Sequence, residues 1–435
     1  MKRLISPIFL SILMLFSISS TAFAAENTPP AVVAKSAVTI DADTGEIIYA
    51  KDIDAKVYPA STTKLITAML LTEAKKPTDE LSYTQSAAAQ PAFSLKLNVH
   101  DLKVGEKITA DNAMKGLLIY SANDIAYMIA GNVINKPDAS VADTTNEFSA
   151  LMNKKAQQLG MKNTHFVTPN GLHDPNHYTT AYDMSILGKN AFANKWILDT
   201  VKLKNTVVET VDGIKLPVEN RNKLILDNQP VYDSTCIGGK TGYTDEAGKC
   251  LVSLFNRNGK KIISVVMKSA YDKDDTQVFK DTLTAVNWSY KQIQTPLFKG
   301  GDTYKTVTVS YKPLKFFGPV KTVKVPLILK ENINYYKNTI NDNEKKLTDN
   351  VQNLDAWKLN TSAAVGNVTL TERGVTKQYK LYSELSTGSI MKSSTGLYVG
   401  IAVAAVVAIA LLITLLVKIK SLFRSDKRRY NKKGW

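Results

Sequence analysis

Two residues at the start of an apolar segment have the types and the spacing of a nucleophile and its base. In "YPASTTKLITAMLLTEA", residues 58–74, Ser61 lies three positions before Lys64. Residues at i and i+3 share one helix face, so the hydroxyl and the amine can meet. A serine hydroxyl is a poor nucleophile until a base removes its proton, and burial or nearby cations lower the pKa of a lysine enough to make it that base. The spacing predicts Ser61 at a helix N-terminus, where free N–H groups favour a developing oxyanion.

Two further motifs separate this pair from an ordinary helix start. Ser121-Ala122-Asn123 interrupts the helical pattern of residues 113–134, and Lys240-Thr241-Gly242 lies on a predicted strand. Each motif alone is common. Their occurrence in this order is typical of serine enzymes that combine S-x-x-K, a Ser-x-Asn element and K-T-G.

The chain resembles the serine-type D-alanyl-D-alanine carboxypeptidases, which are low-molecular-mass penicillin-binding proteins of the peptidase S11 kind. The resemblance covers residues 31–292 and rests on "YPASTTKLITAML", "GLLIYSANDIA", "FVTPNGLHDPNHYTTAYDM" and "GGKTGYTDEAGKCLVS". It implies an α+β fold of the β-lactamase/transpeptidase type, an antiparallel sheet with a helical cluster. It also implies a substrate, the peptidoglycan stem peptide ending in D-Ala-D-Ala, and acylation by β-lactams, with no metal or organic cofactor.

The resemblance implies a catalytic role for five side chains. Ser61 attacks the carbonyl between the two D-alanines, and Lys64 accepts its proton. Ser121 relays a proton to the leaving amine, while Lys240 raises the local positive potential. Asn123 hydrogen-bonds Lys64 or the substrate amide.

The K-T-G strand is expected to bind the substrate. Lys240 and Thr241 hold the terminal carboxylate, and Gly242 lets the strand approach the substrate closely. The backbone N–H groups of Ser61 and Tyr243 form the oxyanion hole.

Two positions depart from the pattern of some relatives. Tyr243 stands where those relatives have a histidine. The change is compatible with the expected role of this residue, because only its backbone N–H is needed for the oxyanion hole. An arginine that helps to bind the carboxylate is absent from "VVMKSAYDKDD", where Lys268 and Lys273 are the candidates to replace it.

The elements around these motifs follow from local patterns. Residues 36–51 predict strand, turn, strand, and residues 146–161 predict a helix that ends at Gly160. Thr179 or Thr180 is expected to cap the next helix. Residues 238–270 predict three antiparallel strands and residues 275–292 a closing helix. One antiparallel sheet therefore draws its strands from both ends of the segment, with helices in between.

The chain ends indicate export and anchoring. Residues 1–24 have the basic start, the apolar run and the A-x-A site of a signal peptide. Residues 397–417 form an apolar segment without a charge that is long enough to cross a bilayer. The tail 418–435 is basic, which is typical of segments that stay in the cytoplasm. We expect a single-pass protein of the cell membrane with its catalytic body on the cell-wall side.

Between these ends the sequence predicts three segments. The DD-peptidase domain covers residues 25–293, a small β-rich domain covers 294–385, and a flexible tether covers 386–396. The β-rich domain alternates apolar and polar residues and carries no charge cluster, aromatic pair or metal-ligand set to argue from. We expect it to act as a spacer that holds the active site away from the bilayer, and recruitment of a partner stays open.

The net charge and the two cysteines add little to the assignment of function. The formal net charge is +16, but the leader and the tail hold much of it, and the mildly basic body has no nucleic-acid motif. Cys236 and Cys250 flank the K-T-G strand, and their spacing leaves a disulfide open while favouring two buried thiols.

Three alternatives remain. A zinc hydrolase would use His173 and His177, but "HDPNH" contains a proline and predicts a loop. A catalytically silent cell-wall-binding or scaffold protein would keep the fold, although here no motif residue is lost. An endopeptidase or transpeptidase would share every motif, because the outcome depends on whether water or an amine reaches the acyl-enzyme.

Overall fold

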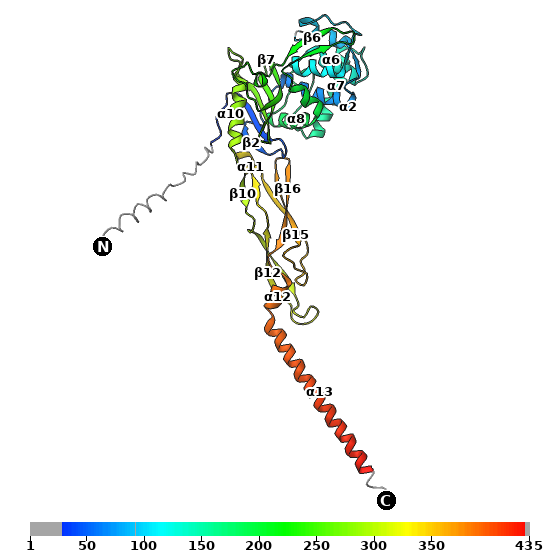
Figure 1. The fold of residues 1–435 in the computed structure, drawn as a ribbon, viewed down its shortest axis with the longest axis vertical. Helices are drawn as coiled ribbons and strands as arrows, with labels where there is room; N and C mark the ends of the chain where they lie inside the picture. The colour runs from blue at the N-terminus through cyan, green and yellow to red at the C-terminus, as the bar shows by residue number, and fades with distance from the viewer. Residues whose placement is uncertain (1–27, 92, 431–435) are drawn as a thin grey trace, which may run out of the picture. The chain divides into compact units, whose positions relative to one another are not determined.

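The computed structural model describes residues 28–91 and 93–430, so the predicted signal peptide lies outside the described residues. The chain forms two compact units (Figure 1). The first extends to Gln294 and includes Tyr336–Asn343. The second comprises Thr295–Tyr335 and the chain from Glu344 onward.

A five-stranded antiparallel sheet organises the first unit, in the order β2-β1-β9-β8-β7. The first strands of the chain thus pair with the last strands of the unit, which confirms the predicted α+β sheet. Its strands are β1 (Ser36–Asp41), β2 (Ile47–Lys51), β7 (Cys236–Thr244), β8 (Gly248–Arg257) and β9 (Lys260–Ser269).

Helices cover both faces of this sheet (Figure 1). Side chains alternate along a strand, so Val252 of β8 joins the core beneath the helical cluster, whereas Leu251 joins the core beneath α10. The helical elements are η1 (Ala60–Thr63), α2 (Lys64–Ala74), α3 (Gln85–Ala88), α4 (Leu95–Asn98), α5 (Ala110–Lys115), η2 (Gly116–Tyr120), α6 (Asn123–Val133), α7 (Val141–Leu159), α8 (Ala181–Ala193), α9 (Lys195–Val201), η3 (Lys223–Ile225) and α10 (Gln277–Lys291).

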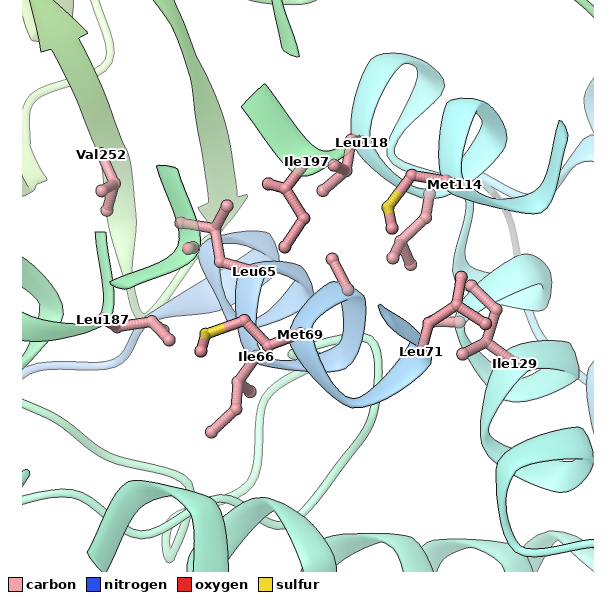
Figure 2. Packing of buried hydrophobic residues seen from close by; sticks show 14 of the residues in the cluster. Leu65, Ile66, Met69, Leu71, Met114, Leu118, Ile129, Leu187, Ile197 and Val252 are labelled. Atoms are coloured by element: carbon pink, nitrogen blue, oxygen red, sulfur yellow. The ribbon is translucent and has the colours of Figure 1, made fainter. Parts of the chain in front are cut away.

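The helix α2 is buried along nearly its whole length, since its sequence is apolar on all sides. Figure 2 shows its side chains surrounded by residues from several helices and from β8. This packing holds the first residue of α2, Lys64, at a fixed depth. The residues in contact there include Leu65, Ile66, Met69, Leu71, Met114, Leu118, Ile129, Leu187, Ile197 and Val252.

Helix ends agree with the sequence in two places and differ in two. The helix α7 ends at Gly160, and Thr180 caps α8 by accepting a hydrogen bond from the Asp183 N–H. However, α7 begins at Val141, earlier than predicted, because Ser140 caps it through the Asp143 N–H. The regular α-helix of the first motif begins at Lys64, and Ser61 lies in the preceding 3₁₀ turn.

The second unit is built on an antiparallel sheet in the order β11-β12-β16-β15-β14. Its apolar residues, such as Val325 and Leu381, form a separate core. The strands are β10 (Thr295–Phe298), β11 (Thr303–Tyr311), β12 (Lys321–Leu329), β13 (Ile333–Tyr335), β14 (Lys346–Val351), β15 (Ala364–Glu372) and β16 (Val375–Ser383). Two short antiparallel strand pairs belong to the first unit, β3 (Glu80–Ser82) with β4 (Lys107–Thr109) and β5 (Asn205–Glu209) with β6 (Lys215–Glu219). The short helix α11 (Thr339–Glu344) lies between β13 and β14 in the sequence.

The prediction of a flexible tether over residues 386–396 is wrong for Thr387–Lys392. Thr387–Lys392 form the helix α12, which Ser386 caps. Ile390 is buried in the core of the second unit, and the Thr387 hydroxyl donates to the carbonyls of Ala356 and Leu359. Ile390 and the Thr387 hydroxyl together dock the segment on the second unit, which its mostly small and polar composition did not indicate.

The helix α13 runs from Thr395 to Tyr430 and is longer than the predicted span. Its segment Thr395–Leu422 is long and apolar enough to cross a membrane. The helix continues beyond residue 417 because lysine and arginine are good helix formers.

Cys236 and Cys250 are both buried and unbonded, as the sequence favoured. They lie on neighbouring strands out of register, since Cys236 pairs with Phe255 and Cys250 with Gly242. Burial raises the pKa of each thiol to about 12, so both thiols are unreactive at neutral pH.

Candidate active site

Ser61 lies in the 3₁₀ turn at the entrance to α2, on a strained backbone. The residue before it, Ala60, has a φ of 46°, a conformation that costs free energy for a residue with a side chain. Gly171 packs directly on this turn, because a Cβ at Gly171 would stand 1.9 Å from the Ala60 carbonyl oxygen. The loop containing Gly171 therefore fixes the turn that presents Ser61.

Lys64 points its amine at the Ser61 hydroxyl from inside the protein. Its Nζ lies 2.9 Å from Ser61 Oγ, 2.9 Å from Asn123 Oδ1 and 2.8 Å from the Asn170 carbonyl. These three acceptors match the three protons of an ammonium. A neutral amine keeps two of the bonds and turns its lone pair to the hydroxyl.

Burial makes the neutral amine accessible at neutral pH. Lys64 has no exposed surface, and this burial lowers its pKa from 10.5 to about 7, against the attraction of Asp124 and with the help of the Arg221 cation. A base with a pKa near the working pH is well suited to proton transfer.

Ser121 follows a π-helical turn and has left-handed backbone angles. The turn is η2, and Ser121 has φ 72° and ψ 32°. π turns and left-handed non-glycine residues often mark functional sites. The predicted break in the helical pattern is therefore present, and it aims Ser121 Oγ at Lys240 Nζ, 2.8 Å away.

Lys240 is the second buried lysine of the site. It lies on β7, is 1% exposed, and also donates to the Thr241 carbonyl at 2.8 Å. Burial lowers its pKa well below the usual value, and the cations of Lys64 and Arg221 lower it further. The cation of Lys64 thus disfavours the charged form of Lys240.

Asp124 holds the Ser-x-Asn segment in place, and the sequence analysis missed it. Its carboxylate accepts bonds from the Tyr83 hydroxyl and from the backbone N–H groups of Leu95, Lys96 and Ile125. Burial raises its pKa. Only the fold brings these donors together.

The edge of β7 touches the turn that contains Ser61. A Cβ at Gly242 would lie 2.9 Å from the Ser61 nitrogen and 3.0 Å from the Thr62 nitrogen, so only glycine permits this approach. Thr241 is half-buried, and Tyr243 is exposed with its hydroxyl bonded to Asp245. The two predicted oxyanion donors, the N–H groups of Ser61 and Tyr243, thus belong to backbone segments in contact.

The loop of residues 168–177 supports Lys64 and gives His177 a structural role. The Asn170 carbonyl accepts from Lys64, and His177 Nδ1 accepts from the N–H groups of Val167 and Thr168. The other ring nitrogen therefore carries the proton and donates to Thr63 Oγ1 at 2.9 Å. Burial lowers the pKa of His177 to about 3. Because both ring nitrogens bind protein atoms, His177 is not disposed to bind zinc.

Arg221 is a cation of the site that no motif indicated. Its Nε donates to the Tyr120 carbonyl, and its guanidinium lies 5.1 Å from the Tyr120 ring and 5.6 Å from the Phe93 ring. It lowers the pKa of both buried lysines. The predicted replacements for the missing arginine, Lys268 and Lys273, are exposed.

The site has the chemistry of a serine enzyme that transfers an acyl group. A serine bonded to a buried lysine lies beside a second serine–lysine pair and the edge of a strand. Residues 23–270 match the family model described as D-alanyl-D-alanine carboxypeptidase, Peptidase S11. The chain belongs to this family.

Individual relatives agree with this assignment. The chain is 32% identical over 365 residues to D-alanyl-D-alanine carboxypeptidase DacF of Bacillus subtilis, covering 81% of this chain and 86% of that protein. It is 34% identical over 280 residues to DacA of Haemophilus influenzae, covering 61% and 66%. The crystal structure of the Streptomyces K15 DD-transpeptidase matches with a TM-score of 0.53 at 26% identity, covering 60% of this chain and 99% of that one. The predicted family, fold class and hydrolase class are confirmed.

Proposed function

We propose that this protein is a membrane-anchored serine DD-carboxypeptidase that removes the terminal D-alanine from peptidoglycan stem pentapeptides through an acyl-enzyme on Ser61. The observation that carries the proposal is the 2.9 Å bond between Lys64 Nζ and Ser61 Oγ, made by a lysine whose pKa is lowered to about 7. β-Lactams, which present a strained amide with a nearby carboxylate, acylate the same serine.

Acylation begins with proton transfer. Neutral Lys64 takes the proton of Ser61, and Oγ attacks the carbonyl carbon between the two D-alanines. The negative charge that develops on the carbonyl oxygen is stabilised by the N–H groups of Ser61 and Tyr243. A single donor of this kind contributes about 10²–10³ in rate in other enzymes.

Collapse of the tetrahedral intermediate breaks the C–N bond. The Lys64 ammonium gives up the proton that it took from Ser61, and the Ser121 hydroxyl, held at 2.8 Å by Lys240 Nζ, relays it to the leaving amine. The terminal carboxylate of the substrate binds at Thr241, where its negative charge favours the ammonium form of the neighbouring Lys240. Arg221 adds positive potential at the site and takes the place of the arginine that the following strand lacks.

Deacylation repeats this proton transfer with water. Water attacks the ester, Lys64 accepts the proton of the water, and it returns that proton to Ser61 Oγ as the ester C–O bond breaks. Aminolysis by a second peptide would give a transpeptidase, and cleavage of a cross-link an endopeptidase, on the same residues. We propose hydrolysis because DacF and DacA, which match the chain over 365 and 280 residues, are named carboxypeptidases, although the similar Streptomyces K15 structure is named a DD-transpeptidase.

We further propose that α13 spans the cell membrane, with the basic tail in the cytoplasm and the catalytic unit on the cell-wall side. The support is the apolar segment Thr395–Leu422 and the lysines and arginines that follow it. The second unit then acts as a spacer between membrane and catalytic unit.

Release of D-alanine from a stem pentapeptide tests the activity. Wild-type protein is expected to release D-alanine and no cross-linked dimer, and EDTA is expected to leave the rate unchanged. Ser61→Ala should abolish release, whereas Ser149→Ala, a matched change on the surface of α7, should not. A wild-type protein that folds but releases no D-alanine would favour the silent scaffold instead.

A further inference from the structure

Residues 312–321, which are the connection between β11 and β12 and the first residue of β12, expose a cluster of large apolar side chains on the second unit. Phe316 is 71% exposed and Phe317 is 75% exposed, with Leu314 and Val320 also exposed. Lys312, Lys315 and Lys321 lie among them. We call this segment the aromatic loop.

The aromatic loop has a defined conformation that keeps these side chains away from the core. The Lys315 N–H donates to the Lys312 carbonyl at 2.9 Å, and the backbones of Leu314 and Phe317 form an isolated antiparallel β-bridge. Gly318 has a φ of 95°, which allows the chain to turn back. Two adjacent phenylalanines held outward in this way indicate a binding surface.

Strand register places the aromatic loop at the end of the module from which the chain enters α13. The strand β12 pairs with β16 through Leu327↔Ser383 to Leu329↔Leu381. The residues from Lys321 to Pro326 therefore run beyond the end of β16, by about 20 Å at 3.3 Å per residue. The chain that follows β16 forms α12 and α13.

Two hydrogen bonds attach the aromatic loop to this end of the module. The Tyr398 hydroxyl, in the first turn of α13, donates to the Pro313 carbonyl at 2.7 Å. Trp357 Nε1 donates to the Lys312 carbonyl at 3.2 Å. Tyrosine and tryptophan are the residues that mark the interface of a membrane, and here both hold the aromatic loop beside the start of the apolar helix.

We propose that the aromatic loop inserts into the outer leaflet of the bilayer that α13 crosses. Phe316 and Phe317 enter the boundary between headgroups and acyl chains, and the lysines bind anionic headgroups. The observation that selects a lipid surface over a protein partner is continuity: the loop is bonded to the first turn of the membrane helix itself. Two attachment points then fix the orientation of the second unit on the membrane, which one helix alone does not.

Site-directed spin labelling of the full chain tests this insertion. The protein is placed in vesicles of phosphatidylethanolamine and phosphatidylglycerol, with a label at Phe317→Cys or at Val320→Cys, which keeps both phenylalanines. Thr376→Cys, exposed at the opposite end of β16, is the aqueous reference. Leu411→Cys, on α13, is the lipid reference. The native thiols are buried and do not compete for the label.

Power saturation compares accessibility to oxygen, which concentrates in lipid, with accessibility to a nickel chelate, which stays in water. The expected oxygen-to-nickel ratio at both loop positions is several-fold higher than at Thr376→Cys and approaches that of Leu411→Cys. A nickel accessibility equal to that of Thr376→Cys would overturn the proposal, and so would protection from both reagents, which indicates a protein partner.

The same labels separate this proposal from the anchoring on which it rests. A water-like ratio at Leu411→Cys would overturn both, whereas a lipid-like ratio there with a water-like loop overturns only the insertion. Replacing phosphatidylglycerol with phosphatidylcholine should lower the ratio at Val320→Cys, and an unchanged ratio would refute the role of the lysines.

Discussion

The rate of acylation should rise with pH as Lys64 loses its proton. With a pKa of about 7, about a tenth of the amine is neutral at pH 6 and about nine-tenths at pH 8, so the rate should increase about tenfold between them. A lysine at its ordinary pKa would be neutral in only about one molecule in three thousand at pH 7. The lowered pKa of Lys64 therefore raises the fraction of neutral amine at pH 7 by about 10³.

Arg221 offers a way to move this midpoint without touching either lysine. Its cation lowers the pKa of Lys64, so Arg221→Gln should shift the midpoint of acylation to higher pH. Arg221→Lys keeps the positive charge, so its midpoint of acylation should stay close to that of the wild type. Stopped-flow measurement of acylation by a fluorescent β-lactam from pH 5 to 10 gives all three profiles. A wild-type rate that is flat in pH, or a midpoint above pH 9, would refute Lys64 as the base.

Three further predictions follow from single contacts. Gly171→Ala should lower both Tm and acylation, because its Cβ would stand 1.9 Å from the Ala60 carbonyl oxygen. Gly160→Ala, at the same φ of 82° with open space, should cost only about 1–2 kcal/mol. Equal losses would contradict this role of the loop. In the wild type the folded state lowers the pKa of His177 to about 3, so the free energy of unfolding should fall as the pH drops from about 6.5 to 3. His177→Gln should remove this dependence on pH, which denaturant melts at pH 4 and 7 measure. Ser121→Ala should slow D-alanine release with little change in Tm, and an unchanged rate would exclude the proton relay.

The parts of the site that the sequence predicted are those encoded by local spacing. Ser61 and Lys64 are one turn apart, and the helix break that contains Ser121 is visible in the hydrophobic pattern. The K-T-G strand is predictable because β-branched and apolar residues flank it. These motifs also order the sheet, since the first and last strands frame the helices.

The parts that escaped the sequence analysis depend on contacts between distant segments. The Asn170 carbonyl reaches Lys64 across 106 positions, and Asp124 collects donors from α4. Arg221 acts on the buried lysines through space and carries no motif of its own. The docking of α12 depends on Ile390 finding a core that only the folded second unit provides.

The central claim is that Ser61 is the nucleophile, and the most direct measurement is peptide mapping by mass spectrometry after incubation with a reporter β-lactam. The expected result is one adduct per chain, on Ser61, that is lost in Ser61→Ala and retained in Ser149→Ala. An adduct on another residue, or labelling of Ser61→Ala at the wild-type level, would contradict the mechanism.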